Sequence, residues 1–269
     1  MKLFLARMAL MLSLLVPVYF AAAALGVKFG LIDWKLGLLT LTFQYGIFVL
    51  GGALVIALIA FVVAIATKPR RGWAIALIAL LIPAAGLGFA LSVGQKAASI
   101  PPIHDITTNT DDPPVFSDAV MKLRAETPSV NPINAPTAPL SESALYKSDP
   151  RFEAILSKSP AELAKAAYPD VTTLKTTAKS ADAFTAVVAA AEAMGLTTVT
   201  SDSAAGVYEG YFQSFWFGFK DDVAVRIRPD GEGSAIDVRS TSRVGISDLG
   251  ANAARIKALL ADVSKRLAS

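Results

Sequence analysis

The sequence contains no cysteine and only one histidine, His104, and both shortages exclude kinds of chemistry. Without cysteine the chain forms no disulfide, no thiolate metal site and no cysteine nucleophile, although an oxidising and a reducing compartment both remain open. A nucleophilic triad would have to use His104, and no Gly-x-Ser-x-Gly turn supplies a serine for it. The acidic residues are scattered, so no catalytic carboxylate pair is nominated. The sequence therefore carries no catalytic signature.

Acidic residues are nearly absent from the first 96 residues, where Asp33 is the only one of the chain's 22. This part carries eight Lys and Arg, a net charge of +7, whereas residues 97–269 carry 17 bases against 21 acids, a net charge of −4. The pI near 9.0 thus comes from the front of the chain. Because the remainder is mildly acidic and its bases are not clustered, no nucleic-acid partner is expected.

Three long apolar stretches fill the front of the chain, at about residues 4–26, 43–67 and 73–95. Each is long enough to cross a hydrocarbon core, which needs about 20 residues. The sequence therefore predicts a transmembrane region over residues 1–96, with Phe29–Phe43 as an interfacial segment between the first two spans. No ionisable residue lies in the middle of a span, which argues against a proton relay, an ion path or a transporter.

The turn between the second and third spans, Lys68-Pro69-Arg70-Arg71, predicts the orientation. Short basic turns are retained in the cytoplasm, and Lys2 and Arg7 place the N-terminus on the same side. The odd number of spans then predicts a multi-pass protein of the bacterial inner membrane with a periplasmic C-terminal domain. The first span could instead be a cleaved signal ending near Ala21–Ala24. Its apolar stretch exceeds the roughly 7–15 residues of such a signal, so an anchor is favoured.

Proline marks the next part of the chain, since nine of the 15 prolines fall in residues 101–150. We expect residues 97–150 to be an extended Pro-rich segment that forms neither helix nor sheet. A globular domain is expected over residues 151–269. Near its start, Ser159 and Glu162 have the spacing of a capping box, which predicts a short helix to about Ala167.

The domain alternates between strand and helix patterns. A β-rich run at 171–177 precedes a helix from Ser180 to Met194, and a second amphipathic helix runs from Ser247 to the end. Four strands are expected between the helices, at 196–201, 206–217, 220–228 and 234–242. This order predicts an α+β fold, in which a mainly antiparallel sheet has helices packed on one face.

A hairpin signal, Asp230-Gly231, joins the last two strands. With these two residues as the turn, Val225 faces Ile236 and Val223 faces Val238, so one face of the hairpin is aliphatic. The other face carries complementary charges.

Several motifs also stand in one order along the chain. They are Ile103-His104-Asp105-Ile106-Thr107-Thr108 with Pro113-Pro114, Tyr168-Pro169-Asp170, Phe217-Gly218-Phe219-Lys220-Asp221-Asp222, and Ser242-Arg243-Val244-Gly245 with Ser247-Asp248-Leu249-Gly250-Ala251-Asn252. Over about residues 100–268 the chain resembles the domain of unknown function 1499 family, and the front spans are not part of the shared domain. The resemblance implies a defined C-terminal domain and brings no established reaction or ligand.

The strongest candidate site in the sequence surrounds His104, just beyond the third span. His104, Asp105, Asp111 and Asp112 are the candidate ligands of a divalent metal, and His104 is also a weak catalytic candidate. The glycine and the closing glutamate of an EF-hand are missing from this stretch, so it is not an EF-hand. A hydrogen-bonded or solvated segment is the favoured alternative.

Two further groups of residues are candidates for ligand binding. Arg243, Ser247 and Asp248 lie at the turn where a helix is expected to begin, so they could hold an anion. For the arginines of the hairpin, pairing with Asp222 and Asp237 across the strands is favoured. Trp216 belongs to a run of aromatic residues on both faces of one strand. The second face would be covered by the Pro-rich segment, by a partner or the membrane surface, or by an apolar ligand.

These observations favour a non-enzymatic envelope protein whose periplasmic domain binds a partner or a lipid-like ligand, with no cofactor predicted. An envelope enzyme that uses His104 and nearby acids is one alternative. An accessory subunit of a membrane protein complex is the other.

Overall fold

The computed structural model describes residues 1–268, and the chain divides into two compact units. One unit comprises Met1–Lys96 together with Ser214–Gly218, and the other comprises Ala97–Gln213 together with Phe219–Ser269. They are described in turn.

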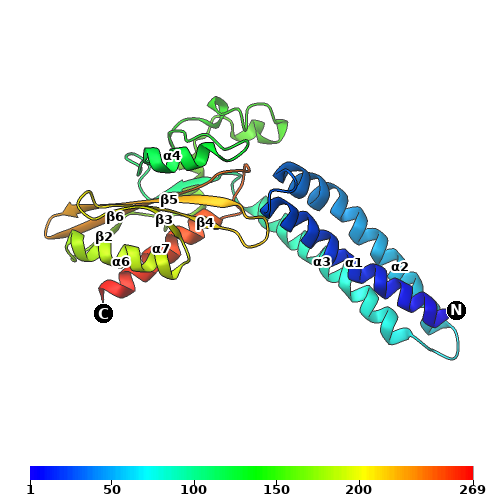
Figure 1. Ribbon diagram of the computed structural model, residues 1–269. Helices are drawn as coiled ribbons and strands as arrows, with labels where there is room; N and C mark the ends of the chain where they lie inside the picture. The colour runs from blue at the N-terminus through cyan, green and yellow to red at the C-terminus, as the bar shows by residue number, and fades with distance from the viewer. Residues whose placement is uncertain (269) are drawn as a thin grey trace. The chain divides into compact units, whose positions relative to one another are not determined.

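The first unit is built from long apolar helices, as the sequence predicts (Figure 1). They are α1 (Lys2–Lys28), α2 (Gly46–Ala66) and α3 (Trp73–Ser99), with a π-helix, η1 (Lys35–Tyr45), that runs directly into α2. The stretch Lys35–Ala66 is therefore one apolar helix of 32 residues. The expected interfacial segment Phe29–Phe43 is not a separate element, because most of it belongs to η1.

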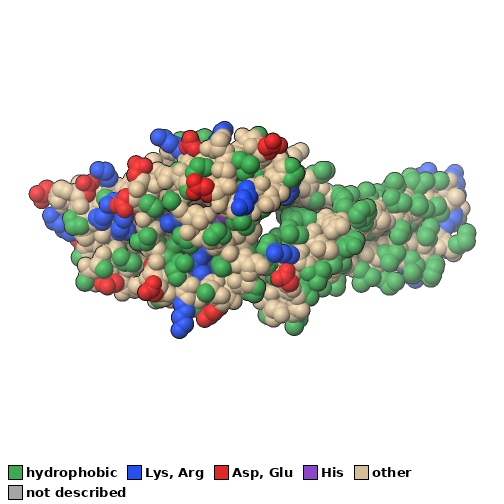
Figure 2. Space-filling view, turned by 90° about the horizontal axis from the view of Figure 1, so that it is seen from above, with side chains coloured by type: hydrophobic (Ala, Val, Ile, Leu, Met, Phe, Trp, Pro, Cys, Tyr) green, Lys and Arg blue, Asp and Glu red, His purple; other side chains and the backbone are tan. Residues whose placement is uncertain are grey.

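Small residues fill the interior of this unit, and large apolar side chains cover its surface. The buried positions shared by the three helices are Ala6, Ala9, Ala57, Ala60, Ala64, Ala76 and Ala79. Small side chains allow the backbones to approach closely, which is how transmembrane helices associate. Figure 2 shows hydrophobic side chains over most of the visible surface of the helices. By length and composition, all three helices can cross a membrane.

The second unit contains one antiparallel sheet of six strands, which confirms the α+β fold class. The strands are β1 (Asp105–Thr107), β2 (Leu174–Thr176), β3 (Thr197–Asp202), β4 (Val207–Gln213), β5 (Lys220–Asp230) and β6 (Gly233–Ser242). Their order is β1-β6-β5-β4-β3, and β2 also pairs with β6. Both short strands therefore extend the same edge of β6.

The β5–β6 hairpin has a different register from the one expected. Asp230 pairs with Gly233, so Gly231 and Glu232 form the turn, and Val225 lies opposite Val238. Gly231 has a φ of 60°, which suits a type II′ turn with glycine at its first central position. The predicted register is thus wrong by two residues, but an even shift leaves the same side chains on the same face.

Two helices, α6 (Ser180–Ala193) and α7 (Ala251–Leu267), pack on the aliphatic face of the sheet (Figure 1). The core between them contains the strand residues Val223, Val225, Ile227, Ile236 and Val238. The start of α7 differs from the expected Ser247, because positive φ values at Gly245, Leu249 and Gly250 are incompatible with a helix. The capping box at Ser159 and Glu162 is confirmed, and it begins α5 (Pro160–Ala167).

The Pro-rich segment covers the opposite face of the sheet, so the expectation that it forms neither helix nor sheet is wrong. It contributes β1, the helix α4 (Asp118–Ala125) and a 3₁₀ turn, η2 (Leu140–Glu142), and a second 3₁₀ turn, η3 (Pro150–Ile155), begins at its last residue. Figure 1 shows α4 on the side of the sheet opposite to α6 and α7. Its prolines fall between these short elements, where a missing N–H removes no ladder bond.

Candidate functional site

A cavity of about 260 Å³ lies where the Pro-rich segment folds back over the beginning of β1. Its walls combine proline, alanine and other apolar side chains with six residues that carry polar or charged side chains. The lining residues are Ile103, His104, Asp105, Pro132, Asn134, Ala135, Pro136, Ala138, Pro139, Leu140, Glu142, Ser143, Tyr146 and Pro160. Apolar wall surface combined with converging polar groups is a feature of ligand sites.

The buried His104 is fixed from both its backbone and its ring. Its carbonyl oxygen accepts hydrogen bonds from Ser242 N and Asn252 Nδ2, each at 2.9 Å, so β6 and α7 both hold it. The ring Nδ1 lies 3.4 Å from the hydroxyl of Tyr146, which also lies 3.5 Å from the carbonyl of Ile246. The imidazole of His104 and the phenol of Tyr146 are therefore neighbours in the cavity wall.

Burial also determines the charge of this pair. Loss of water lowers the pKa of His104 below its usual value, more than the nearby Asp105 raises it. Loss of water raises the pKa of Tyr146 as well. Both groups are consequently neutral near pH 7, where they can donate or accept hydrogen bonds to a ligand without bringing a charge.

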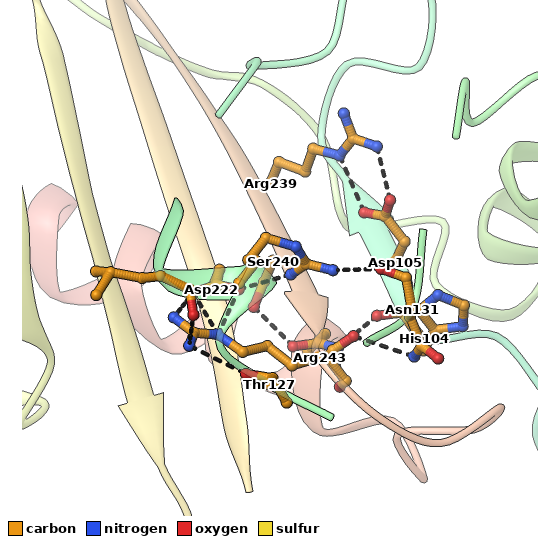
Figure 3. A network of polar contacts seen from close by, with 12 residues as sticks. His104, Asp105, Thr127, Asn131, Asp222, Arg239, Ser240 and Arg243 are labelled. Carbon is orange, nitrogen blue, oxygen red and sulfur yellow. Dashed lines mark hydrogen bonds and ion pairs between the residues drawn. The ribbon is translucent and has the colours of Figure 1, made fainter. Parts of the chain in front are cut away.

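The carboxylate in the cavity wall, Asp105, is already paired. Arg239 donates to it from Nε at 3.0 Å and from Nη2 at 2.6 Å (Figure 3). The same Nη2 also donates to Asn134 O at 2.9 Å. Arg239 is almost fully buried. This pairing ties β6 to β1 and to the Pro-rich segment, and it neutralises the charge beside His104.

The four candidate metal ligands are not brought together. Asp111 is exposed, and Asp112 forms ion pairs with Arg226 and Arg228 at 3.0 and 3.1 Å. Within residues 1–268 no group of three or more His, Asp or Glu side chains has the geometry to hold a metal ion. Only His104 and Asp105 share the cavity.

The candidate anion site is likewise occupied by groups of the protein itself. Arg243 is buried and donates to Asp222 from Nη2 at 2.6 Å, with a second bond from Nε at 3.0 Å (Figure 3). Asp248 accepts hydrogen bonds from Gly250 N at 2.7 Å and Asn252 N at 2.9 Å, so a carboxylate already sits where α7 begins. Burial raises the pKa of Asp248. Ser247 Oγ accepts from Leu249 N at 3.3 Å.

Two buried carboxylates on the face of the sheet opposite to α6 and α7 also pair with residues that the sequence analysis did not identify. Arg124 of α4 is buried and lies 2.6 Å from Asp222, opposite Arg243. Glu209 of β4 is fully buried and accepts hydrogen bonds from the backbone N and the hydroxyl of Ser117 at 2.6 and 2.5 Å. No local pattern signals these partners, which lie about 100 residues apart in the sequence. The Pro-rich segment therefore packs over this face of the sheet.

The last candidate, Trp216, lies in the β4–β5 loop, far from the cavity in sequence. It is 54% exposed, and its neighbour Phe215 is 70% exposed. By contrast, Tyr211 and Phe212 of β4 lie under Arg243 and Arg255, on opposite faces of the sheet. Within the aromatic run at residues 208–219, only Phe215 and Trp216 thus present large exposed rings.

The fold and the cavity together define an α+β domain with a small cavity of mixed polarity, preceded by three helices that can cross a membrane. Residues 105–263, more than half of the chain, match the family model described as protein of unknown function (DUF1499), and the chain belongs to this family. No curated protein matches the chain.

Proposed function

We propose that this chain is a multi-pass protein of the bacterial inner membrane whose periplasmic domain is a non-enzymatic binding module. In this proposal the His104 cavity, defined by the lining residues above, holds a lipid-like ligand or a segment of a partner protein. The observation that carries the proposal is the chemistry of the cavity wall, where apolar side chains lie beside a neutral histidine, a neutral tyrosine and other polar side chains.

The size and polarity of the cavity indicate what it would hold. Ligand sites for whole drug-sized molecules have volumes of about 300–1,000 Å³. A cavity of about 260 Å³ suits part of a lipid or one or two side chains of a partner. The described lining residues include no lysine or arginine, so the wall offers no cationic partner to an anion. Of its two carboxylates, Asp105 is paired with Arg239 and Glu142 belongs to an exposed residue, so the wall favours a group without negative charge that has a hydrogen-bonding atom near His104.

The groups around His104 also favour binding over catalysis. A nucleophilic mechanism needs a nucleophile that is activated by a neighbouring base. The ring of His104 faces the Tyr146 hydroxyl, whose pKa is raised, and the nearest carboxylate is held by two bonds from Arg239. Neither neighbour is an activated nucleophile.

The orientation rests on where the bases lie in the helical unit. Lys2 Nζ donates a hydrogen bond to the carbonyl of Lys68 at 3.2 Å, so the N-terminus and the basic turn lie at the same end of the helices. Arg70 and Arg71 belong to the same turn. A cluster of bases at one end of the spans favours a cytoplasmic location for that end, and the domain after α3 then lies outside the cytoplasm.

Native mass spectrometry tests the binding proposal. The full-length protein is extracted in mild detergent from its own membrane, alongside Ala138→Trp, which fills the cavity, and Ala154→Trp on η3, which lies outside it. We expect a stoichiometric extra mass on the wild type and on Ala154→Trp that is absent from Ala138→Trp. A bare wild-type chain, or an extra mass that Ala138→Trp retains, would contradict the proposal. An extra mass equal to a metal ion would favour the enzyme alternative.

A further inference from the structure

Residues Ser214–Gly218 of the loop between β4 and β5 differ from an ordinary hairpin loop because they include two exposed aromatic rings. Hairpin loops are usually formed by small and polar residues. Here the rings of Phe215 and Trp216 stack edge to face, with centroids 5.2 Å apart, and both remain largely exposed. The loop groups with the apolar helices in one compact unit. Its exposed apolar surface therefore belongs to the part of the chain that enters the membrane.

Lys28 contacts this loop, which locates the loop next to the C-terminal end of α1. Its Nζ donates to the carbonyl of Phe215 at 2.7 Å and lies 4.6 Å from the centroid of the Phe215 ring. Lys28 is also the first charged residue after Arg7, so it marks the point where the uncharged stretch of α1 ends. A lysine at the end of a span places its ammonium group at the lipid headgroups, and aromatic rings are enriched at this same depth.

Other exposed apolar residues lie at this end of α1. Phe29 and Leu31, which follow Lys28 in the turn before η1, are 68% and 78% exposed. With Phe215 and Trp216 they would form an uncovered apolar surface if the surroundings were water. The lipid interface next to the end of a span is the environment that covers them.

We propose that Phe215 and Trp216 insert into the outer interfacial layer of the lipid bilayer, which makes the β4–β5 loop a second membrane contact of the chain. The loop thereby tethers the end of β4 and the beginning of β5 to the lipid surface. This inference rests on the three spans crossing a membrane and is independent of any ligand in the His104 cavity, so either proposal can fail without the other.

Tryptophan fluorescence tests this insertion in the full-length protein in phosphatidylcholine nanodiscs. Replacing Trp34 and Trp73 by Phe leaves Trp216 as the only tryptophan. The matched control is a chain with all three tryptophans replaced by Phe and with Glu232→Trp. Glu232 is exposed in the turn at the other end of β5, about 35 Å along the strand for 11 residues. We expect lipids brominated near the headgroup to quench Trp216 at least about twofold and to leave the control unchanged. Equal quenching of the two probes by aqueous acrylamide, with no lipid quenching, would overturn the proposal.

Chemical labelling gives a second measurement that does not depend on the tryptophan replacements. Because the chain has no cysteine, Trp216→Cys and Glu232→Cys each introduce a single thiol. In nanodiscs we expect a membrane-impermeant maleimide to label residue 216 at least about tenfold more slowly than residue 232. Similar rates would show that the loop stands in water, and the inference would then be wrong.

Discussion

Asp222 and Arg243 form a two-pronged ion pair inside the domain, with Nη2 2.6 Å from Oδ1 and Nε 3.0 Å from Oδ2. Arg124 of α4 approaches the same carboxylate at 2.6 Å, and all three side chains are almost fully buried. One of these arginines comes from the Pro-rich segment, while Arg243 follows β6. The ion pairs thus join the cover of the second face to the sheet itself, and residues 105–160 are part of the fold rather than a linker.

Loss of Asp222 should therefore destabilise the domain strongly. Asp222→Ala leaves two buried arginines without their anion, and removing one member of a buried charge pair costs about 3–5 kcal/mol. The matched control, Asp230→Ala, removes an exposed ion pair with Lys175 that is worth about 0–1 kcal/mol. Pulse proteolysis in urea on the detergent-solubilised protein measures both free energies of unfolding. Equal values for the two variants would show that the buried pairs contribute nothing.

The capping box of α5 predicts a smaller, local effect. Ser159 accepts a hydrogen bond from Glu162 N, and Glu162 in turn accepts from Ser159 N at 2.7 Å. Ser159→Ala removes the acceptor of the Glu162 N–H, so the free energy of unfolding should fall by about 1 kcal/mol. Ser157→Ala at an exposed position is the control and should change it by less than about 0.5 kcal/mol. A loss at Ser157 as large as the loss at Ser159 would argue against the cap.

Acid should weaken the domain through His104. Burial lowers its pKa in the folded state, so just below the usual value of 6.5 the unfolded chain binds a proton that the folded chain does not. The free energy of unfolding then decreases as the pH falls below about 6.5, by up to about 1.4 kcal/mol per pH unit until the folded-state pKa is reached.

His104→Gln isolates this contribution, because the variant contains no histidine. Groups such as Asp248, whose pKa is raised, titrate in both proteins and cancel in the difference. We expect the wild type to lose more stability than His104→Gln between pH 6.5 and pH 5, measured by the same proteolysis assay. Parallel curves for the two proteins would mean that the pKa of His104 is the same in the folded and unfolded states.

Periodic patterns in the sequence were sufficient for most of the second unit. Helix and strand periodicity placed α6, and the hydrogen-bonding pattern of serine and glutamate placed the start of α5. The aliphatic face of the β5–β6 hairpin was also predictable, because an even error in register keeps Val225 and its neighbours on one face. What failed was the exact turn, since Asp230-Gly231 and Gly231-Glu232 both place glycine where a tight turn accepts it.

The cover of the second face could not be predicted for a different reason. The many prolines in residues 101–150 indicate extended chain, and short elements such as α4 contain too few residues to show a hydrophobic period. Contacts such as Arg124 with Asp222 and His104 with Tyr146 join residues 98 and 42 positions apart, and they depend on the tertiary fold alone. The cavity follows from those contacts, so composition and spacing could nominate His104 but not its partner.

The orientation of the chain in the membrane is the claim on which the account depends most. It is tested by fusing alkaline phosphatase or green fluorescent protein after Ser269, with matched fusions after Arg71 in the basic turn. Alkaline phosphatase is active only outside the cytoplasm, whereas green fluorescent protein exported unfolded does not fluoresce there. The account predicts active phosphatase and no fluorescence after Ser269, and the reverse after Arg71. Fluorescence without phosphatase activity after Ser269 would place the domain in the cytoplasm and contradict the account.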